Sequence, residues 1–263
     1  MIEVKNLSKA YGDTPGLKNV SFKLQNGKIY GVIGADGAGK STLLRLMAGV
    51  IGPDEGSVKI NGFDMAKEPS SAKSCIGYLA ENAPLYGDMT PVEYLSYLAE
   101  VRGLSYERGI RRVNEALERA QMERYRNTLI SNLPNGVAGR LAVVQAALGK
   151  QDILILDDPF AELDEHRRTE MRDLIRGLAE NRTVILSTTD TEQVTSLCER
   201  ILWLREGELY RDLWAEEFDR DARAEFREMK RNRSDKRAAA KPVRNRREGA
   251  YEILDEDEGG DAV

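Results

Sequence analysis

A glycine-rich loop that ends in lysine and serine constrains this chain more than any other feature. It matches the pattern G-x-x-x-x-G-K-[ST] in full, with the residues Gly34-Ala35-Asp36-Gly37-Ala38-Gly39-Lys40-Ser41-Thr42. Glycines allow successive backbone N–H groups to turn inward around an anion without obstruction by side chains. We expect Lys40 to reach the β- and γ-phosphates of a nucleotide and the Ser41 hydroxyl to bind Mg²⁺.

The flanking segments have the character that this loop requires. The run Lys28–Ile33 is short and mostly apolar, which predicts a strand that leads into the loop. Residues Ser41–Ala48 have apolar side chains at helical spacing and predict a helix whose positive end faces the phosphates. A strand, a glycine loop and a helix in this order indicate a nucleotide site rather than a glycine-rich turn with a chance lysine.

The rest of the chain alternates between strand and helix patterns. Ile153–Leu156 and Val184–Ser187 are continuous apolar runs, typical of a parallel sheet covered on both faces. Helices are expected between them and after them, at Glu165–Glu180 and Thr191–Arg200. Shorter strands are expected at Ile2–Val4, Val20–Leu24, Gly56–Gly62 and Ile76–Leu79. This alternation predicts an α/β fold with a doubly covered, mostly parallel sheet.

A helical stretch is predicted from Thr90 to about Glu123. It opens with Thr-Pro-Val-Glu, which supplies an N-cap, a proline at the first helical position and the glutamate of a capping box. Two segments with apolar periodicity follow, around Tyr94–Val101 and Gly109–Ala120.

A pair of acids follows the buried strand pattern at Ile153–Leu156. In open α/β sheets, ligands bind beyond the carboxyl ends of the strands. Asp157 and Asp158 stand at that position, where a carboxylate can hold Mg²⁺ opposite the phosphate loop. With that loop upstream, we favour this interpretation over a pair of ordinary loop acids.

Composition sets further limits. The 263 residues, of which 41% are apolar, suffice for one α/β core with a small satellite. No apolar run of about 18 residues indicates a membrane span, and Met1–Lys5 lacks the pattern of a secretory signal. Cys75 and Cys198 are expected to be buried free thiols in a reducing cytosol. A single histidine, His166, largely excludes His-rich metal sites and His-based triads.

The end of the chain is strongly charged. Residues Arg223–Arg247 are basic, Glu252–Asp261 are acidic, and apolar residues thin out after Trp214. We expect residues 216–263 to form a charged tail, first a helix and then disorder. A solvated tail that pairs its own charges is favoured, and contact with anionic lipid headgroups or RNA is the alternative.

Several motifs in one order resemble the ATP-binding subunit of ABC transporters, over roughly residues 2 to 210. They are the adenine-stacking Tyr11, the Walker A loop Gly34–Thr42, a Q-loop Ile76–Asn82, a signature segment Leu133–Val137, the Walker B Asp157, a D-loop Ala161–Asp164 and a switch loop Ser187–Asp190. The segment Glu81–Thr90 is similar to single-domain subunits of the ABC-2 export type, including gliding-motility-like ones.

The resemblance implies a P-loop NTPase core with a small antiparallel β subdomain and an inserted helical subdomain. The ATP-binding domain would span residues 1–215, with the helical insert at about 83–137. The implied cofactors are ATP and Mg²⁺. Nucleotide contacts would come from Tyr11, Gly34, Asp36, Gly37, Ala38, Gly39, Lys40, Ser41 and Thr42. The implied metal ligands are Ser41, Glu81 and Asp157. The implied catalytic residues are Asp158, Thr189 and Glu81. The signature residues that would act on a partner's nucleotide are Pro134, Asn135 and Gly136.

Glu81 stands in place of the Q-loop glutamine, and Val137 lacks the usual polar side chain. Three further departures fall on positions that serve hydrolysis. Asp158 stands in place of the catalytic glutamate, Thr189 in place of the switch histidine and Pro134 in place of the signature serine. A carboxylate withdrawn by about 1 Å can cost about a hundredfold in rate. Proline has neither an N–H nor a hydroxyl, yet it is acceptable in the first turn of a helix. We therefore expect ATP binding to persist while hydrolysis is weakened.

How weak the hydrolysis is stays open at this point. Aspartate can act as a base in place of glutamate, and His166 beside the D-loop offers a further titratable group. Slow but real turnover and negligible turnover are both consistent with the sequence.

The favoured function is that of the ATP-binding subunit of an ABC exporter. It would lie in the cytoplasm on the inner face of the membrane, form a homo- or heterodimer on binding ATP and move a separate integral membrane subunit docked on the segment Pro84–Leu133. A hydrolysis-deficient regulator or scaffold is the alternative. An ABC protein acting on nucleic acid is less expected, because such proteins usually carry two ATPase units in one chain.

Overall fold

The fold contains two β-sheets. The computed structural model describes residues 1–240, with side chains as far as Arg231. The larger sheet has the order β10 (Glu208–Trp214), β9 (Arg200–Arg205), β3 (Ile29–Ile33), β8 (Thr183–Thr188), β7 (Ile153–Leu156) and β6 (Ile76–Leu79). Its strands are parallel from β9 to β6, and only β10 is antiparallel to its neighbour. The predicted α/β fold with a mostly parallel sheet is confirmed.

The smaller sheet is antiparallel, also as expected. Its order is β2 (Thr14–Leu24), β1 (Ile2–Tyr11), β4 (Glu55–Ile60) and β5 (Phe63–Asp64). The first strand is much longer than the predicted Ile2–Val4. The sequence pattern missed its second half because the register of β1 shifts between Val4 and Leu7. Asn6 has a left-handed φ of 47° there, and such a bulge interrupts the alternation that the sequence pattern relies on.

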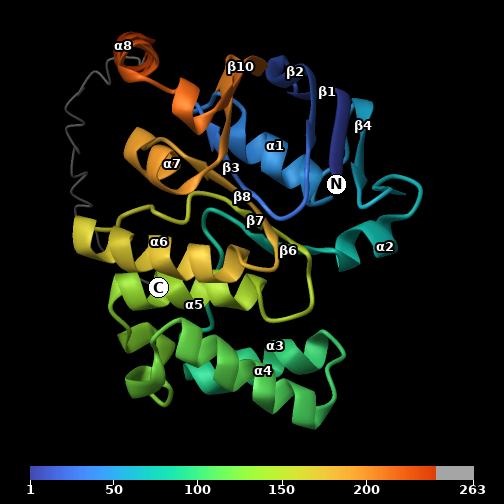
Figure 1. The fold of residues 1–263 in the computed structure, drawn as a ribbon, viewed down its shortest axis with the longest axis vertical. Coiled ribbons are helices and arrows are strands. Elements are labelled where there is room, and N and C mark those ends of the chain that lie inside the picture. The colour runs from blue at the N-terminus through green and yellow to red at the C-terminus, as the bar shows by residue number, and fades with distance from the viewer. Residues whose placement is uncertain (241–263) are drawn as a thin grey trace, which may run out of the picture.

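The central strands are apolar on both faces because both faces are covered. Ile153 and Ile155 of β7 pack in the cluster that contains α1 (Lys40–Met47) and the antiparallel sheet. The alternate residues Leu154 and Leu156 pack in a second cluster. That cluster contains α5 (Asn135–Ala146), α6 (Glu165–Ala179) and α7 (Thr191–Leu197). Figure 1 shows α1 on one side of the sheet and α5 and α6 on the other.

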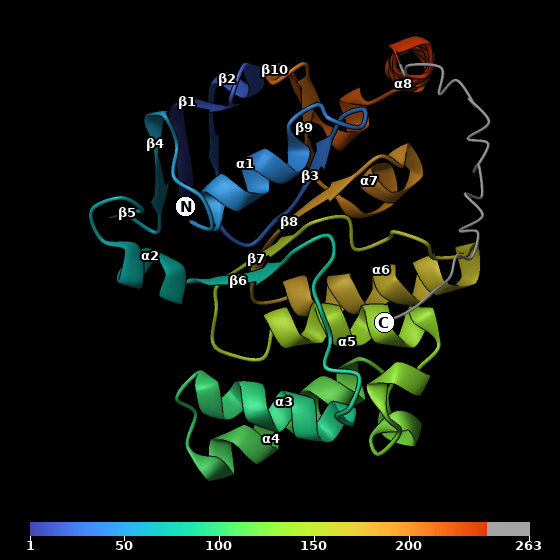
Figure 2. The same cartoon turned by 180° about the vertical axis from the view of Figure 1, so that it is seen from behind.

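The helical insert lies beyond α5 and α6, away from the sheet, as Figures 1 and 2 show. It contains α3 (Pro91–Val101), α4 (Tyr106–Arg119) and the 3-10 turns η1 (Glu123–Tyr125) and η2 (Ile130–Asn132). The predicted capping box is present, since Thr90 N donates to Glu93 Oε2 at 2.8 Å and Glu93 N donates to Thr90 Oγ1 at 3.4 Å. A short helix α2 (Pro69–Ser74) precedes β6.

The beginning of the charged tail differs from the expected solvated segment. After the turn η3 (Ala215–Glu217), Phe218 and two residues of α8 (Arg220–Ala240), Ala222 and Phe226, are buried in the core. The rings of Phe218 and Phe226 lie 5.8 and 5.4 Å from the ring of Trp203 on β9. These apolar residues recur every four positions among many charges, so composition alone hides the stripe. The expected disorder lies beyond residue 240, outside the described residues.

Two smaller expectations need correction. Cys198 is buried, but Cys75 is only half-buried, because it caps the C-terminal end of the short surface helix α2. The last predicted helix also ends earlier than Arg200, since Cys198 is already extended, with ψ of 147°. Within the described part of the chain, no helix is long and apolar enough to cross a membrane.

Candidate nucleotide-binding site

The glycine loop connects β3 to α1, as the sequence predicts, and its glycines are required by close packing. Gly39 has φ of 105°, and a Cβ there would lie 2.6 Å from the carbonyl oxygen of Gly16. A Cβ on Gly34 would lie 2.7 Å from the carbonyl oxygen of Leu204. The turn between β9 and β10 closes against the loop, because Gly207 N donates to the Ala38 carbonyl at 3.1 Å. No larger residue fits Gly34 or Gly39 without displacing backbone.

The first turn of α1 suits an anion. Its N-cap is Gly39, no side chain caps the helix, and the first turn contains no acidic residue. The N–H groups that begin an α-helix lack partners within the helix and carry its positive partial charge. Lys40, Ser41 and Thr42 present these groups at the end of the loop, which is the arrangement that binds phosphate.

Lys40 lies at the centre of a group of acids that are far apart in the sequence. Its Nζ donates to the carbonyl oxygens of Gly34 at 2.9 Å and Ala35 at 3.4 Å. Burial lowers the pKa of the ammonium, and four carboxylates oppose that shift. They are Asp36, Asp158, Asp157 and Glu81. The fold thus brings the Walker A, Q-loop and Walker B segments together around one ammonium group.

Asp157 has the surroundings of a metal-binding carboxylate. It is almost fully buried, and its Oδ1 accepts from Ser41 Oγ at 3.1 Å and from Ser187 Oγ at 2.6 Å. Its Oδ2 is buried and has no hydrogen-bond partner. A buried carboxylate oxygen without a partner is costly unless a cation or water satisfies it. The residues present therefore fit Mg²⁺.

The wider surroundings also fit this ion. Among the described residues, no group of three or more His, Cys, Asp or Glu side chains could by itself hold a metal. Mg²⁺ does not need such a group, because it keeps several waters and takes one or two carboxylates together with substrate phosphates.

Asp158 is half-buried and held in an uncommon backbone conformation. Its φ is 47°, a left-handed value that aspartate tolerates better than most residues, and its N–H donates to Ser187 Oγ at 2.9 Å. Burial raises the pKa of the Asp158 carboxyl to about 6; the Lys40 ammonium opposes the rise, and Glu81, Asp157 and Asp36 add to it. An acid with a pKa near 6 is suited to exchanging a proton near neutral pH.

Ser187 is a residue of this site whose role the sequence did not reveal. It lies fully buried on β8, where it donates to Asp157 Oδ1 and accepts from the backbone N–H of Asp158. A single hydroxyl thus aligns both acids. The available signal was a serine near the end of an otherwise apolar strand, but its partners are set by the pairing of β8 with β7.

Tyr11 and Glu81 lie at the edges of the site. Tyr11 is 47% exposed. A Cβ on Gly16 would lie 3.0 Å from the Tyr11 ring and 3.3 Å from Thr42 Cγ2, so the ring is close to the start of α1. Sequence reasoning had not singled out Gly16. Glu81 is exposed after β6, on the side of the site where Asp157 and Asp158 lie.

Thr189 comes directly after β8, beside the glycine loop. In the parallel pairing of β3 and β8, Ile33 is the partner of Thr188, so Thr189 and Gly34 leave adjacent strands at the same level. The carbonyl oxygen of Thr189 accepts from Lys230 Nζ at 3.4 Å. His166, by contrast, is exposed, and its Nδ1 lies 3.8 Å from Glu170.

The signature segment forms the start of α5, with Pro134 as the N-cap. The proline is therefore one position before the first turn in which the sequence placed it. Its carbonyl oxygen accepts from Val137 N at 2.8 Å and Ala138 N at 3.0 Å. A Cβ on Gly136 would lie 2.4 Å from Arg167 Cδ, at the start of α6.

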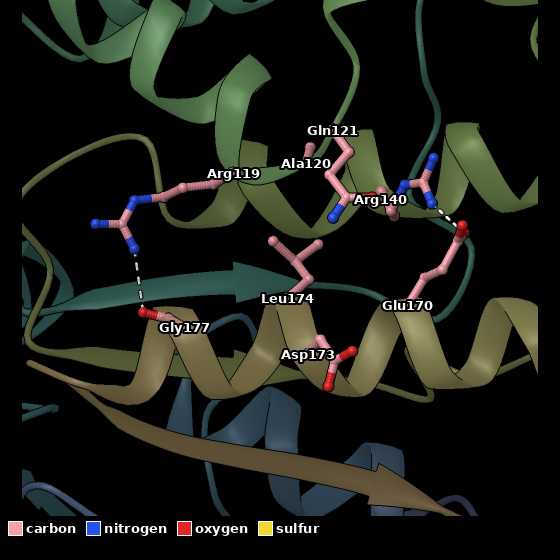
Figure 3. Close-up of a pocket in the computed structure, with 8 residues that line it drawn as sticks. All are labelled: Arg119, Ala120, Gln121, Arg140, Glu170, Asp173, Leu174 and Gly177. Carbon is pink, nitrogen blue, oxygen red and sulfur yellow. Dashed lines mark hydrogen bonds and ion pairs between the residues drawn. The ribbon is translucent and has the colours of Figure 1, made fainter.

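A separate pocket of about 130 Å³ lies between the end of α4, α5 and α6 (Figure 3). Arg140 of α5 pairs there with Glu170 of α6, and Arg119 NH1 donates to the Gly177 carbonyl at 3.1 Å. Arg140 is almost fully buried. These contacts join the signature helix and the helical insert to α6, and the pocket lies outside the cluster around Lys40.

Comparisons with known proteins agree with this geometry. Residues 17–161 match the family described as ABC transporter. The chain is 35% identical over 207 residues to MJ1023 of Methanocaldococcus jannaschii, an uncharacterised ABC transporter ATP-binding protein, over 78% of this chain and 74% of that protein. It is 30% identical over 210 residues to the linearmycin resistance ATP-binding protein LnrL of Bacillus subtilis, over 80% of this chain and 68% of LnrL.

A solved structure is similar over the same region. The dimeric, post-hydrolysis state of the ATP-binding cassette MJ0796, bound to ADP and phosphate, superposes with a TM-score of 0.74 at 28% identity. The match covers 82% of this chain and 99% of that cassette.

Proposed function

Because this chain belongs to the ABC transporter family as an ATP-binding subunit, we propose that it binds MgATP between Tyr11 and the acids around Lys40 and couples ATP-driven dimerisation to a separate membrane subunit. We propose further that it hydrolyses ATP slowly. The observation that carries the proposal is the convergence of four carboxylates and one half-buried ammonium on an anion-binding helix start.

The balance of charge supports a nucleotide that arrives with its metal. Four acids face Lys40, so a bare triphosphate would meet net negative charge. Ser41, Asp157 and Glu81 would hold Mg²⁺, with the orphaned Asp157 Oδ2 as the strongest candidate ligand, directly or through water. When bound, Mg²⁺ neutralises charge on the β- and γ-phosphates. Lys40 and the loop N–H groups then hold the phosphate oxygens, and the Tyr11 ring offers a face for the base.

Slow hydrolysis is supported by three short or missing groups. The Asp158 carboxylate is one methylene shorter than glutamate, and its backbone is tied to Ser187, which limits how far it can advance toward an attacking water. Thr189 offers only a short neutral hydroxyl near the γ-phosphate. Pro134 donates no hydrogen bond to a partner's nucleotide. Since phosphoryl transfer depends mainly on positioning and charge stabilisation, each loss lowers the rate more than the affinity.

The experiment compares the natural chain with a restored variant, Asp158→Glu, Thr189→His and Pro134→Ser. We expect MgATP affinity within about threefold and turnover at least about a hundredfold faster in the restored chain. Lys40→Ala, placed in both backgrounds, is the control that removes binding. Equal turnover in the natural and restored chains would show that these three positions do not limit hydrolysis.

The dimer and the membrane partner are part of the proposal. The solved cassette MJ0796 is dimeric, and the relative LnrL is named for resistance to linearmycin, which favours an export role. The ABC-2 type is proposed from the segment Glu81–Thr90. The membrane subunit would dock on the helical insert that contains α3 and α4, placing this chain on the cytoplasmic face of the membrane. Light scattering with and without MgATP, using Lys40→Ala as control, tests the ATP-driven dimer.

A hydrolysis-deficient regulator is the second candidate. It is favoured by the same observation at Asp158, Thr189 and Pro134. Tight MgATP binding with no turnover, with and without a candidate membrane subunit, would select this candidate over the exporter subunit.

A further inference from the structure

We infer that Lys230, on α8, is a positioning residue for the loop at Thr189 and thereby for recognition of the γ-phosphate. The inference rests on the proposed function, since it concerns the same nucleotide site. Its starting observation is that Lys230 Nζ donates to the carbonyl oxygen of Thr189 at 3.4 Å, although 41 positions separate the two residues.

The loop that Lys230 contacts lies in the middle of the site. β8 is between β3, which leads into the glycine loop, and β7, which leads into Asp157 and Asp158. Ser187, two residues before Thr189, bonds to both of those acids. A displacement of the segment after β8 would therefore move residues that lie next to Asp157 and Asp158, where the proposed function places the terminal phosphate.

The first turns of α8 are held against the core, which directs Lys230 toward the loop at Thr189. Ala222 and Phe226 are buried against the core, and Lys230 follows at the same spacing of four, on the same side of the helix. Glu225 accepts from Tyr210 OH at 2.6 Å and pairs with Arg211 at 2.8 Å, both on β10. The helix thus runs from the β9–β10 hairpin toward the loop at Thr189, and Figure 1 shows α8 and α7 on the same side of the sheet.

The next residue of the loop is held from the other side. Asp190 Oδ2 accepts from Arg168 NH1 of α6 at 3.1 Å, while its Oδ1 accepts from Glu192 N at the start of α7. Lys230 and Arg168 therefore fix two consecutive residues from opposite elements. Thr189 itself has no long cationic side chain, and α8 supplies a cation to its backbone through Lys230.

This arrangement gives a specific expectation for nucleotide discrimination. ATP and ADP share the contacts to the glycine loop, and they differ in the γ-phosphate that the loop at Thr189 faces. Loss of the Lys230 bond should therefore weaken MgATP and leave MgADP unchanged. A hydrogen bond from a charged donor at an exposed position corresponds to about a three- to tenfold change in affinity.

The chain contains a natural reporter for this test. It has two tryptophans, and Trp203 is fully buried beneath Phe218 and Phe226. In a Trp214→Phe background, the fluorescence of Trp203 reports the packing of α8. We would titrate MgATP and MgADP against this background, measure both affinities by calorimetry, and repeat the titrations with Lys230→Ala, Lys230→Arg and Arg227→Ala.

We expect Lys230→Ala to lower the preference for MgATP over MgADP about three- to tenfold and to reduce the change in Trp203 fluorescence caused by MgATP. Lys230→Arg keeps a cation and should retain the preference. Arg227→Ala removes the same charge from an exposed position one turn earlier and should have no effect.

Two results would overturn the inference. One is an unchanged preference for MgATP over MgADP in a Lys230→Ala chain that has the same melting temperature as the natural chain. The other is an equal loss of MgATP and MgADP affinity, which indicates a merely structural role. If the unmodified chain binds neither nucleotide and behaves as Lys40→Ala does, the proposed function itself fails.

Discussion

Asp158 shows how a single residue can be placed for function at a cost in stability. Its carboxyl is half-buried beside three other acids and has a pKa of about 6, against an ordinary value of 3.8. Between these values the folded chain holds a proton that the unfolded chain has released. The stabilisation from that proton is full below about pH 4 and is lost as the pH rises through 6. Above that, the ionised carboxylate destabilises the nucleotide-free protein.

The variant Asp158→Asn tests this cost. The interval from 3.8 to about 6 corresponds to about 3 kcal/mol at about 1.4 kcal/mol per pH unit, and partial exposure reduces this to about 1–2 kcal/mol. We expect the nucleotide-free variant to be more stable by that amount at pH 7.5, with a flatter pH dependence between pH 5 and 7. Urea unfolding measures the free energy. Asp88→Asn, at an exposed carboxyl, is the control; an Asp158→Asn chain that is less stable than the natural one would contradict the assignment.

Among the elements, α5 and α6 are joined by an ion pair whose partners are unequally buried. The Arg140 side chain is 7% exposed and that of Glu170 is 33% exposed. The guanidinium Nε of Arg140 also has no hydrogen-bond partner. A buried charge without its partner costs more than an accessible one, because only the accessible charge can be hydrated. The pair connects α5, the signature helix, to α6, the helix that follows the D-loop. Its stability depends mainly on keeping the buried Arg140 charge paired.

This asymmetry predicts unequal effects of two substitutions. Glu170→Ala leaves the buried Arg140 charge unpaired and should destabilise the chain by about 2–4 kcal/mol. Arg140→Met removes that charge and fills similar space, and should cost less, about 0–2 kcal/mol. Denaturant unfolding of both single variants and of the double variant measures the difference. A larger loss in Arg140→Met than in Glu170→Ala would exclude this reading of the pair.

The whole molecule is expected to respond to its ligand as one unit, because the nucleotide site contacts both core clusters. A ligand at a hundred times its dissociation constant stabilises the folded state by about 2.7 kcal/mol. For a chain of this size we expect the melting temperature to rise by about 5–10 °C with MgATP. Chelation of Mg²⁺ with EDTA should abolish most of this rise, since four acids then face the triphosphate unscreened. An equal rise with ATP and EDTA would contradict the proposed metal role of Ser41 and Asp157.

Features that depend on residues close together in the chain could be predicted from the sequence, and features that depend on long-range contacts could not. The loop Gly34–Thr42, the buried strands β7 and β8 and the capping box of α3 were predictable, because each depends on residues that are neighbours in the chain. β9 and β10 were not identified, and α8 was expected as the helix of a solvated, charged tail rather than as one packed on the core. The apolar run at 201–204 in β9 was a readable strand signal that was missed. β10 has no buried residue, and the few apolar residues at the start of α8 are buried only through contacts such as that of Phe226 with Trp203.

By itself, the sequence determined that a phosphate-binding loop follows a strand and precedes a helix, because glycine spacing and apolar periodicity are local properties. It also predicted that Asp157 and Asp158 lie opposite that loop, because they follow a buried strand. The tertiary structure alone decided that Ser187 aligns these two acids and that Lys230 reaches Thr189. These partners come together because parallel strands end at one edge of the sheet and because helices pack on its two faces. No spacing along the chain contains that information.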